Sequence, residues 1–266
     1  NNTLSGYGGR LIISKLSMLD TISQIAKYYD VSNIVYNDLY EPYFIEYKEK
    51  LKDYCLQLNI ELDIVNSSYL TKPGDVTKDD GDFYKVFTPF SRKILSLIAP
   101  VLEQTEIPLN CFTNDEFRFE ISVEDLKLTT NNSWEERVMS HWNVTEKAAL
   151  KMLDGFVESR IHAYSVDRDF PSIEGTSKLS AYLHFGQISP HLVWRKSIQQ
   201  GAPYCRQLIW REFAMYLYVK FPKLKSKPLN PVFEHFQYES NHEKLLAWQK
   251  GLTGYPIVDA GMRQLY

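Results

Sequence analysis

The chain has 266 residues, of which 44% are hydrophobic and 24% charged, and its formal net charge is −3 at pH 7. This length accommodates one large or two ordinary domains, and the composition is typical of a globular chain. Because no apolar run approaches the roughly 20 residues of a membrane-spanning helix and no signal-peptide pattern occurs, we expect neither a membrane protein nor a secreted one. The three scattered cysteines predict buried thiols in a reducing, intracellular compartment.

The N-terminal part predicts strands that alternate with helices. Short apolar runs predict a buried strand at Gly9–Ser14 and two further strands at Ser32–Asn37 and Glu61–Ser67. Residues at helical spacing separate these runs, in one helix capped by Ser17 and a second that starts near Glu41. This order predicts a parallel sheet with right-handed crossovers, although no strand–helix turn carries a GxGxxG or Walker sequence.

We predict three parts along the chain. Residues 1–103 are expected to form an α/β domain with a Rossmann-like parallel sheet, and residues 104–142 have the polar, irregular composition of a linker. From residue 143 to 266 the apolar spacing is wholly helical, which predicts an all-α domain. Asn143 and Glu146 fit a capping box at its first helix.

The charge is unevenly distributed along the chain. Residues 1–177 carry 18 Lys and Arg against 28 Asp and Glu, a net charge of −10, whereas residues 178–266 carry 12 against 5, a net charge of +7. A basic, aromatic-rich C-terminal part is typical of a nucleic-acid-binding surface, and it is equally compatible with simple solvation.

Signatures of metal and hydrolytic sites are missing from the sequence. His184 and His191 have no Cys or His partner at metal-ligand spacing, so no metal site is expected. Neither GxSxG nor HExxH occurs.

Three hydroxyl side chains lie within five residues, at Thr176, Ser177 and Ser180, between a loop and a predicted helix. Hydroxyls and free backbone N–H groups at a helix start bind anions, and Lys178 adds positive charge. The same residues are also explained by helix capping with a solvated lysine, which is the commoner role of such residues. Both interpretations stay open on this segment alone.

Gln207, Trp210, Arg211 and Ala214 share one face of a second predicted helix, at positions i, i+3, i+4 and i+7. An amide, an indole and a guanidinium on one face suit a planar, polar and partly anionic ligand. A half-buried tryptophan beside an arginine that pairs with Glu212 explains the pattern equally well.

Several long segments, in order and at matching spacing, resemble the photolyase/cryptochrome family. They are NDLYEPY, YKVFTPFSR, DRDFPSIEGTSKLSAYLHFGQISPHLVW, RQLIWREFAMYLYVKFP and AWQKGLTGYPIVDAGMRQL. The resemblance covers nearly the whole chain, is weakest from residue 104 to 142, and is greatest to microbial class I enzymes that act on cyclobutane pyrimidine dimers. It implies a photolyase, a carbon–carbon lyase that repairs UV-damaged DNA by light-driven electron transfer from reduced FAD. The alternatives are a cryptochrome-type blue-light receptor and a photolyase for (6-4) photoproducts.

The resemblance implies a set of FAD-binding residues within the helical domain. Most of them hold the diphosphate by hydroxyl and backbone N–H groups, while the arginine lies beside the flavin. These residues are Tyr164, Thr176, Ser177, Lys178, Leu179, Ser180 and Arg211.

The resemblance also implies residues that recognise the lesion. Trp210 matches the tryptophan that stacks on the lesion, and Gln207 matches its neighbour that hydrogen-bonds the flipped bases. Arg168 and Arg211 are implied near the flavin and the DNA backbone. We expect the protein to act as a monomer in the cytoplasm or nucleus.

Three positions depart from the family pattern. Gln207 stands where many dimer-repairing relatives carry Glu, and a neutral amide also occurs in relatives that act on (6-4) photoproducts. Tyr238 stands where relatives carry the surface tryptophan of the photoreduction chain, so we expect it to be a terminal electron donor. Tyr43 and Phe44 replace an amide and a carboxylate of folate-binding relatives, which argues against a folate antenna and leaves the antenna chromophore open.

The chain starts without Met and stops within an apolar pattern at Tyr266, so we expect a fragment of a longer protein. The family's opening strand and its C-terminal flavin-binding segments have no counterpart here. We therefore expect the 266-residue chain by itself to bind FAD poorly and not to repair DNA. Stoichiometric yellow flavin in the purified chain would contradict this expectation.

Overall fold

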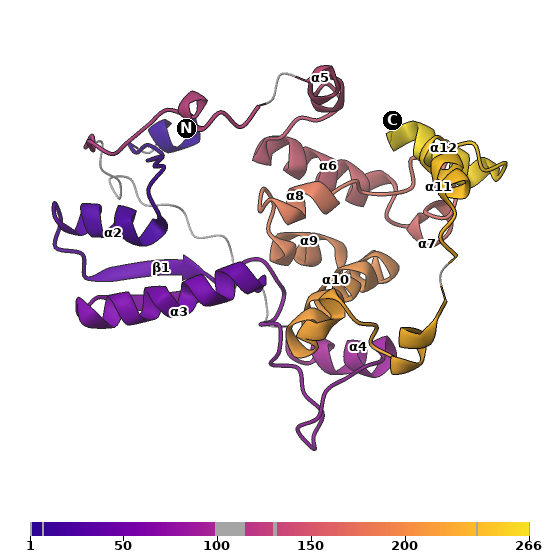
Figure 1. The fold of residues 1–266 in the computed structure, drawn as a ribbon, viewed down its shortest axis with the longest axis horizontal. Coiled ribbons are helices and arrows are strands. Elements are labelled where there is room, and N and C mark those ends of the chain that lie inside the picture. The colour runs from indigo at the N-terminus through magenta and orange to yellow at the C-terminus, as the bar shows by residue number, and fades with distance from the viewer. Residues whose placement is uncertain (1, 7, 99–114, 130–131, 238, 266) are drawn as a thin grey trace. The chain divides into compact units, whose positions relative to one another are not determined.

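The computed structural model describes residues 2–6, 8–98, 115–129, 132–237 and 239–265 (Figure 1). The chain divides into two compact units, Asn1–Lys220 and Phe221–Tyr266, which are described separately. The domain boundaries expected from the sequence, after residues 103 and 142, stay a prediction.

The sheet of the first unit contains two parallel strands, β1 (Asn33–Asn37) and β2 (Glu61–Val65). Asn33 lies opposite Glu61 and Asn37 lies opposite Val65. Helix α3 (Pro42–Gln57) connects the two strands and packs against β2, which confirms the predicted parallel crossover. In Figure 1, α3 runs alongside β1.

The strand predicted at Gly9–Ser14 does not form, so that prediction was wrong. Only Ser14 pairs, in an isolated antiparallel bridge with Glu120, and the Ile121 N–H donates to the Ile13 carbonyl at 3.0 Å. The Arg10 guanidinium also forms an ion pair with Glu120. Contacts with residues 120–121 therefore take the place of the expected pairing within the parallel sheet.

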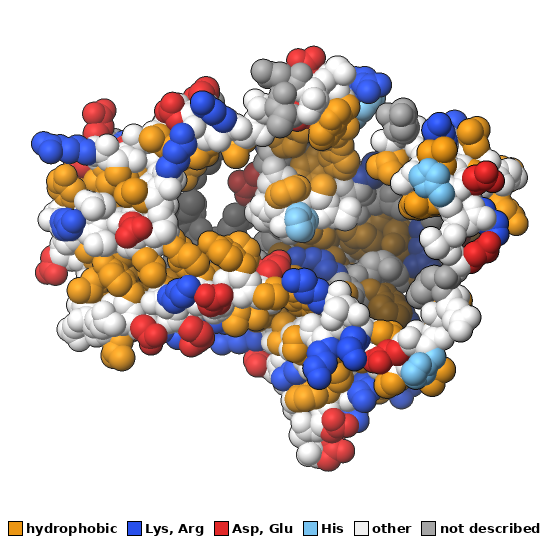
Figure 2. Space-filling model, viewed as in Figure 1, with side chains coloured by type: hydrophobic (Ala, Val, Ile, Leu, Met, Phe, Trp, Pro, Cys, Tyr) orange, Lys and Arg blue, Asp and Glu red, His pale blue; other side chains and the backbone are white. Residues whose placement is uncertain are grey.

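A small hydrophobic cluster lies around the sheet. Its buried members are Leu51, Cys55 and Ile60, and partly buried residues of α2 (Met18–Ala26), β1 and β2 pack against them. As predicted, Ser17 caps α2, and its hydroxyl accepts a hydrogen bond from the Asp20 N–H at 3.1 Å. The outer surface of α3 is charged, with ion pairs of adjacent turns such as Lys50–Glu46 (Figure 2).

Helices form the rest of the first unit. In chain order after the short α1 (Asn2–Gly6), α2 and α3, they are α4 (Phe87–Leu95), the 3₁₀ turn η1 (Glu124–Leu126), α5 (Ser133–Met139), α6 (Glu146–Ser159), α7 (Tyr164–Asp167), α8 (Ser180–His184), α9 (Pro190–Ser197) and α10 (Ala202–Lys220). Ser189 caps α9, because its hydroxyl accepts a hydrogen bond from the His191 N–H. The predicted capping box was wrong: Thr145 caps α6 by accepting from the Ala148 N–H, and Asn143 instead accepts from the Thr145 hydroxyl.

A large hydrophobic cluster forms the core of these helices. It consists of buried residues of α4 and α6–α10 and of the adjoining loops, including Leu70 and Val76 from the chain after β2. Helix α10 packs against α4, α7 and α9. The long-range packing therefore fixes α10, which carries several of the predicted site residues.

The second unit contains η2 (Pro222–Lys225), η3 (Pro231–His235), α11 (His242–Gln249) and α12 (Pro256–Leu265). Asp259 fastens the turn before α12, since its carboxylate accepts hydrogen bonds from Thr253 and from the Gly254 N–H. In the part of the chain that the structure describes, no helix combines the length and apolar character needed to cross a membrane.

Candidate functional site

The hydroxyl segment Thr176–Ser180 leads directly into α8. Ser177 is buried, and its hydroxyl lies 2.9 Å from the Tyr204 hydroxyl and accepts a hydrogen bond from the Leu179 N–H at 3.3 Å. Thr176 and Ser180 are exposed, and Ser180 is the first residue of α8. The N-cap residue is Leu179, whose side chain makes no capping hydrogen bond. Side-chain capping of α8 therefore does not account for the hydroxyls of this segment.

The backbone of this segment changes handedness between two consecutive residues. Lys178 has a φ of 55°, in the left-handed region, and Leu179 has a φ of −86° and a ψ of −4°. Such a change of handedness is typical of the backbone of an anion-binding nest. The Lys178 ammonium lies 2.6 Å from the Glu174 carboxylate, and this contact lowers the pKa of Glu174.

Aromatic packing connects the hydroxyl segment to α7 and α10. The ring of Tyr164 meets that of Tyr204 edge-on at 5.2 Å and that of Phe156 at 5.8 Å. Burial raises the pKa of Tyr204 to about 12, so its hydroxyl stays protonated as the partner of Ser177. The structure thus brings the predicted residues Tyr164 and Ser177 together through Tyr204. Arg168 is exposed and lies 5.7 Å from the Tyr164 ring.

The predicted lesion-binding residues lie on α10. Trp210 stacks on Phe87 of α4, with the ring centroids 3.6 Å apart and the planes 4° from parallel. The indole is nevertheless 44% exposed. Gln207, one turn earlier on α10, is half-buried. The Arg211 guanidinium lies 4.4 Å from the ring centroid of Tyr69.

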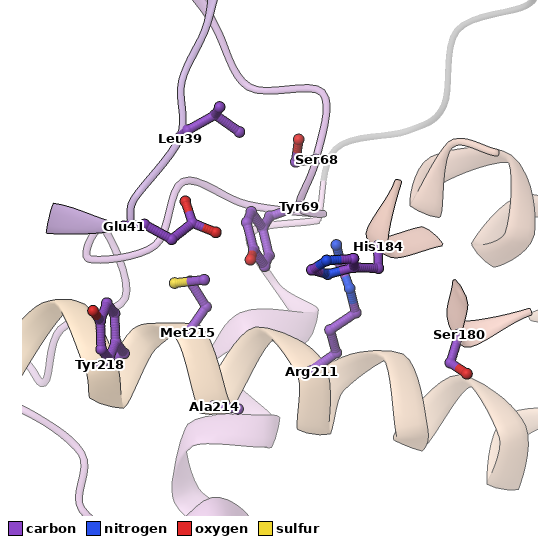
Figure 3. Close-up of a pocket in the computed structure, with 10 residues that line it drawn as sticks. All are labelled: Leu39, Glu41, Ser68, Tyr69, Ser180, His184, Arg211, Ala214, Met215 and Tyr218. Carbon is purple, nitrogen blue, oxygen red and sulfur yellow. The ribbon is translucent and has the colours of Figure 1, made fainter. Parts of the chain in front are cut away.

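A pocket of about 440 Å³ lies between the segments that follow the two strands and the helices α8 and α10 (Figure 3). The carboxyl ends of parallel strands are the usual place for ligand sites in α/β folds. Figure 3 shows Arg211 rising from α10 toward Tyr69, with His184 contributed by α8. The lining residues are Leu39, Glu41, Ser68, Tyr69, Ser180, His184, Arg211, Ala214, Met215 and Tyr218.

The buried carboxyl of Glu212 holds the chain after β2 against α10. It accepts hydrogen bonds from the backbone N–H groups of Leu70 at 3.0 Å and Thr71 at 3.3 Å. Burial raises the pKa of Glu212 to about 7, against the lowering effect of these hydrogen bonds and of Arg211. His191 Nε2 lies 3.1 Å from the Tyr69 carbonyl oxygen. These contacts position the Tyr69 ring beside Arg211.

The structure therefore does not bring all the predicted residues together: Tyr164 and Ser177 meet through Tyr204, away from Trp210 on Phe87. Ser180 and Arg211 share the pocket, whereas Trp210 and Gln207 are not among its lining residues. Tyr238 lies outside the described residues. Within the described ranges, no three His, Cys, Asp or Glu side chains are grouped as metal ligands.

Sequence reasoning missed three residues that shape this site: Tyr69, Phe87 and Tyr204. Tyr69 follows the second strand, and its position at the carboxyl end of a parallel strand was the available signal. Phe87 and Tyr204 have no comparable signal, because their contacts with Trp210 and Ser177 come from packing between helices and loops.

Two family profiles match the chain. Residues 1–108 match one described as DNA photolyase, and residues 204–266 match one described as the FAD binding domain of DNA photolyase. The chain belongs to the photolyase/cryptochrome family. The predicted family and fold class are thereby confirmed, while the subclass of photolyase stays a prediction.

Known photolyases are similar to this chain over nearly all of its length. The deoxyribodipyrimidine photo-lyase of Escherichia coli is 31% identical over 94% of this chain and 54% of its own length. That of Agrobacterium fabrum is 28% identical over 100% of this chain and 57% of its own length. A crystal structure of a bacterial class III photolyase from Agrobacterium tumefaciens superposes with a TM-score of 0.87 at 28% identity, covering 99% of this chain and 56% of that one. This chain thus spans about half the length of the curated relatives it matches.

Proposed function

We propose that this photolyase-family chain is part of a deoxyribodipyrimidine photolyase that uses FAD and blue light to split cyclobutane pyrimidine dimers in DNA. The observation that carries the proposal is the arrangement on α10, where a half-exposed, stacked Trp210 is followed by Arg211, which lines a pocket with Ser180. Similar relatives named deoxyribodipyrimidine photo-lyase support it.

The residues present fit the diphosphate of FAD. The change of handedness at Lys178 and Leu179 gives the backbone the geometry of an anion-binding nest, and the exposed hydroxyls of Thr176 and Ser180 flank it. Ser177 is committed to Tyr204, so we assign it the role of ordering the segment rather than of donating to phosphate. Tyr164, packed on Tyr204, and Arg211 would complete the FAD-binding set.

When bound, reduced FAD supplies the electron that light transfers to the dimer. The chain's own residues bind and orient the substrate. Trp210 offers an aromatic face to a base flipped out of the duplex, and the Gln207 amide both donates and accepts hydrogen bonds at a base edge. Arg168 and Arg211 offer positive charge to phosphate, consistent with the net charge of +7 (12 basic, 5 acidic residues) in residues 178–266.

Several finer assignments belong to the same proposal. We assign the α/β domain to residues 1–103, the linker to 104–142 and the helical FAD-binding domain to 143–266. Tyr238 is proposed as a terminal electron donor. A monomer acting on DNA in the cytoplasm or nucleus is the expected working form.

The proposal is tested with the complete protein encoded by the gene, loaded with FAD and reduced. Under blue light, we expect an oligonucleotide that contains one thymine dimer to lose the dimer, measured by chromatography of the digested strand. Trp210→Ala should weaken binding of this oligonucleotide by about 1–3 kcal/mol, the usual value of a base–aromatic stack. Trp134→Ala, at an indole that is 55% exposed on α5, is the matched control and should bind normally.

Absence of light-dependent dimer loss in protein that binds and reduces FAD would refute the photolyase assignment and favour a blue-light receptor. Loss of a (6-4) photoproduct but not of the dimer would move the assignment to the other lesion, in line with the neutral amide of Gln207. Unchanged dimer affinity in Trp210→Ala would refute the stacking role of Trp210.

A further inference from the structure

Phe87 covers one face of the Trp210 indole. The two rings are nearly parallel, at 4°, and their centroids are only 3.6 Å apart. Trp210 also meets Phe213 edge-on at 5.9 Å, yet it remains 44% exposed, so a large part of the indole is open to solvent. An exposed tryptophan without such a partner samples several side-chain rotamers, and ordering it on binding costs free energy.

Phe87 is itself firmly held. It is only 5% exposed and is the first residue of α4, which packs on α10. Its ring meets that of Phe213 edge-on at 5.8 Å, and the Arg206 guanidinium lies 5.0 Å from its centroid. Arg206 precedes Trp210 by one helical turn, so three side chains of α10, Arg206, Trp210 and Phe213, converge on this one ring of α4.

We propose that Phe87 is a positioning residue for Trp210, which it holds in the orientation that stacks on a flipped-out pyrimidine. The inference rests on the proposed function, because it assigns Trp210 to the lesion. Phe87 does not have to touch the DNA in this arrangement. It fixes the orientation of the indole before binding. The conformational entropy of the Trp210 side chain is therefore lost on folding rather than on binding DNA.

The test uses the complete protein in the dark and measures equilibrium binding by fluorescence anisotropy. The probes are an oligonucleotide with one thymine dimer and the same sequence without damage. Phe87→Leu should weaken binding of the dimer probe about 3- to 10-fold and leave binding of the undamaged probe unchanged, since one side chain loses its preordering. Phe87→Tyr keeps the aromatic face and should retain dimer binding.

Phe90→Leu is the matched control for lost core volume. Phe90 lies one turn further on α4, is fully buried, and packs on Phe213 and Tyr216 at 4.9 and 4.8 Å rather than on Trp210. It should destabilise the fold at least as much as Phe87→Leu while preserving the preference for the dimer. If Phe87→Leu does not fold, Phe87→Met, which has a similar volume but no aromatic face, takes its place.

Undiminished dimer preference in folded Phe87→Leu or Phe87→Met would overturn the proposal, as would an equal loss in Phe90→Leu. Trp210→Ala distinguishes the stacking role of Trp210 from the positioning role of Phe87. If that variant weakens dimer binding and the Phe87 variants do not, only the positioning role fails. If it leaves dimer binding unchanged, the lesion-stacking role fails first and the positioning role fails with it.

Discussion

The two hydrophobic clusters of the first unit are built in different ways. The large cluster joins α4, α6–α10 and the chain after β2, so its contacts bridge residues as distant as Leu70 and Tyr216. Among the described residues, the buried members of the small cluster are Leu51, Cys55 and Ile60, and neighbouring parts of the chain supply partly buried residues. The strands over this cluster alternate between exposed and half-buried residues rather than being covered on both faces.

This difference shows which part of the molecule determines the site geometry. Phe87, Tyr164, Leu179 and Tyr204 all belong to the large cluster. The segment after β2 contributes Tyr69, and its neighbour Leu70 is anchored in the same cluster. The large cluster therefore positions the candidate site. The small cluster mainly stabilises the two-stranded sheet, and the loop that follows β2 carries Tyr69 to the site.

The strongest test of this contrast is Phe156→Ala in the large cluster. Phe156 is fully buried and packs on Tyr164 and Tyr204, so its truncation should cost about 3–5 kcal/mol of unfolding free energy. Denaturant unfolding followed by near-ultraviolet circular dichroism measures it. A loss below about 1 kcal/mol would show that the core around the site repacks freely. It would contradict the conclusion that the large cluster fixes the site geometry.

The second test is the pH dependence of stability that Glu212 introduces. Its pKa of about 7 in the folded state exceeds the ordinary value of 4.5, so the folded state binds the extra proton. The contribution of Glu212 to the free energy of unfolding is therefore complete below about pH 4.5. It is lost as the pH rises through about 7, by up to about 3 kcal/mol. Glu212→Gln should remove this slope in denaturant titrations from pH 4.5 to 8. An unchanged slope in the variant would assign it to other groups.

The third test is Leu51→Ala in the small cluster. Leu51 is fully buried on α3, but this cluster is thinly covered, so the expected cost is about 2 kcal/mol. Amide hydrogen exchange should accelerate in α3, β1 and β2 while α10 stays protected. Equal acceleration in α10 would mean that the two clusters unfold as one cooperative unit.

The smallest expected effect is at Lys178, whose φ of 55° is costly for a residue with a Cβ atom. Lys178→Gly relieves this cost and loses only an exposed ion pair with Glu174, so stability should rise by about 0.5 kcal/mol. Glu174→Gln, which removes the ion pair and keeps the backbone, is the control. A destabilised Lys178→Gly beside a neutral Glu174→Gln would show that the lysine side chain matters beyond this pair.

Local patterns predicted much of the fold. Apolar spacing predicted α3 and α10, and short apolar runs predicted β1 and β2. The strand predicted at Gly9–Ser14 does not form, because an apolar run does not specify which part of the chain pairs with it. Ser14 pairs with Glu120 instead of with the parallel sheet. Similarly, Thr145 rather than Asn143 caps α6, since several adjacent polar residues were eligible and the position of the first turn decides between them.

The sequence predicted many of the residues of the candidate site, but it did not predict the contacts between them. The i, i+4 relation of Gln207 and Arg211 follows from helix geometry, and the hydroxyl segment is visible in the sequence. The Trp210–Phe87 stack joins residues more than a hundred positions apart, and no local period encodes such a contact. The same holds for the Ser177–Tyr204 pair, which depends on how α10 packs.

That pair of hydroxyls ties ligand binding to the stability of the helical core. Ser177 and Tyr204 are 27 positions apart, and α8 and α9 lie between them, so the hydroxyl segment makes this contact only when the start of α10 is docked. A ligand that binds this ordered segment adds RT ln(1 + [L]/Kd) to the stability of the docked state. If FAD binds this segment as proposed, cofactor binding and helix docking are coupled in one equilibrium, and a rise in melting temperature with FAD concentration would report both.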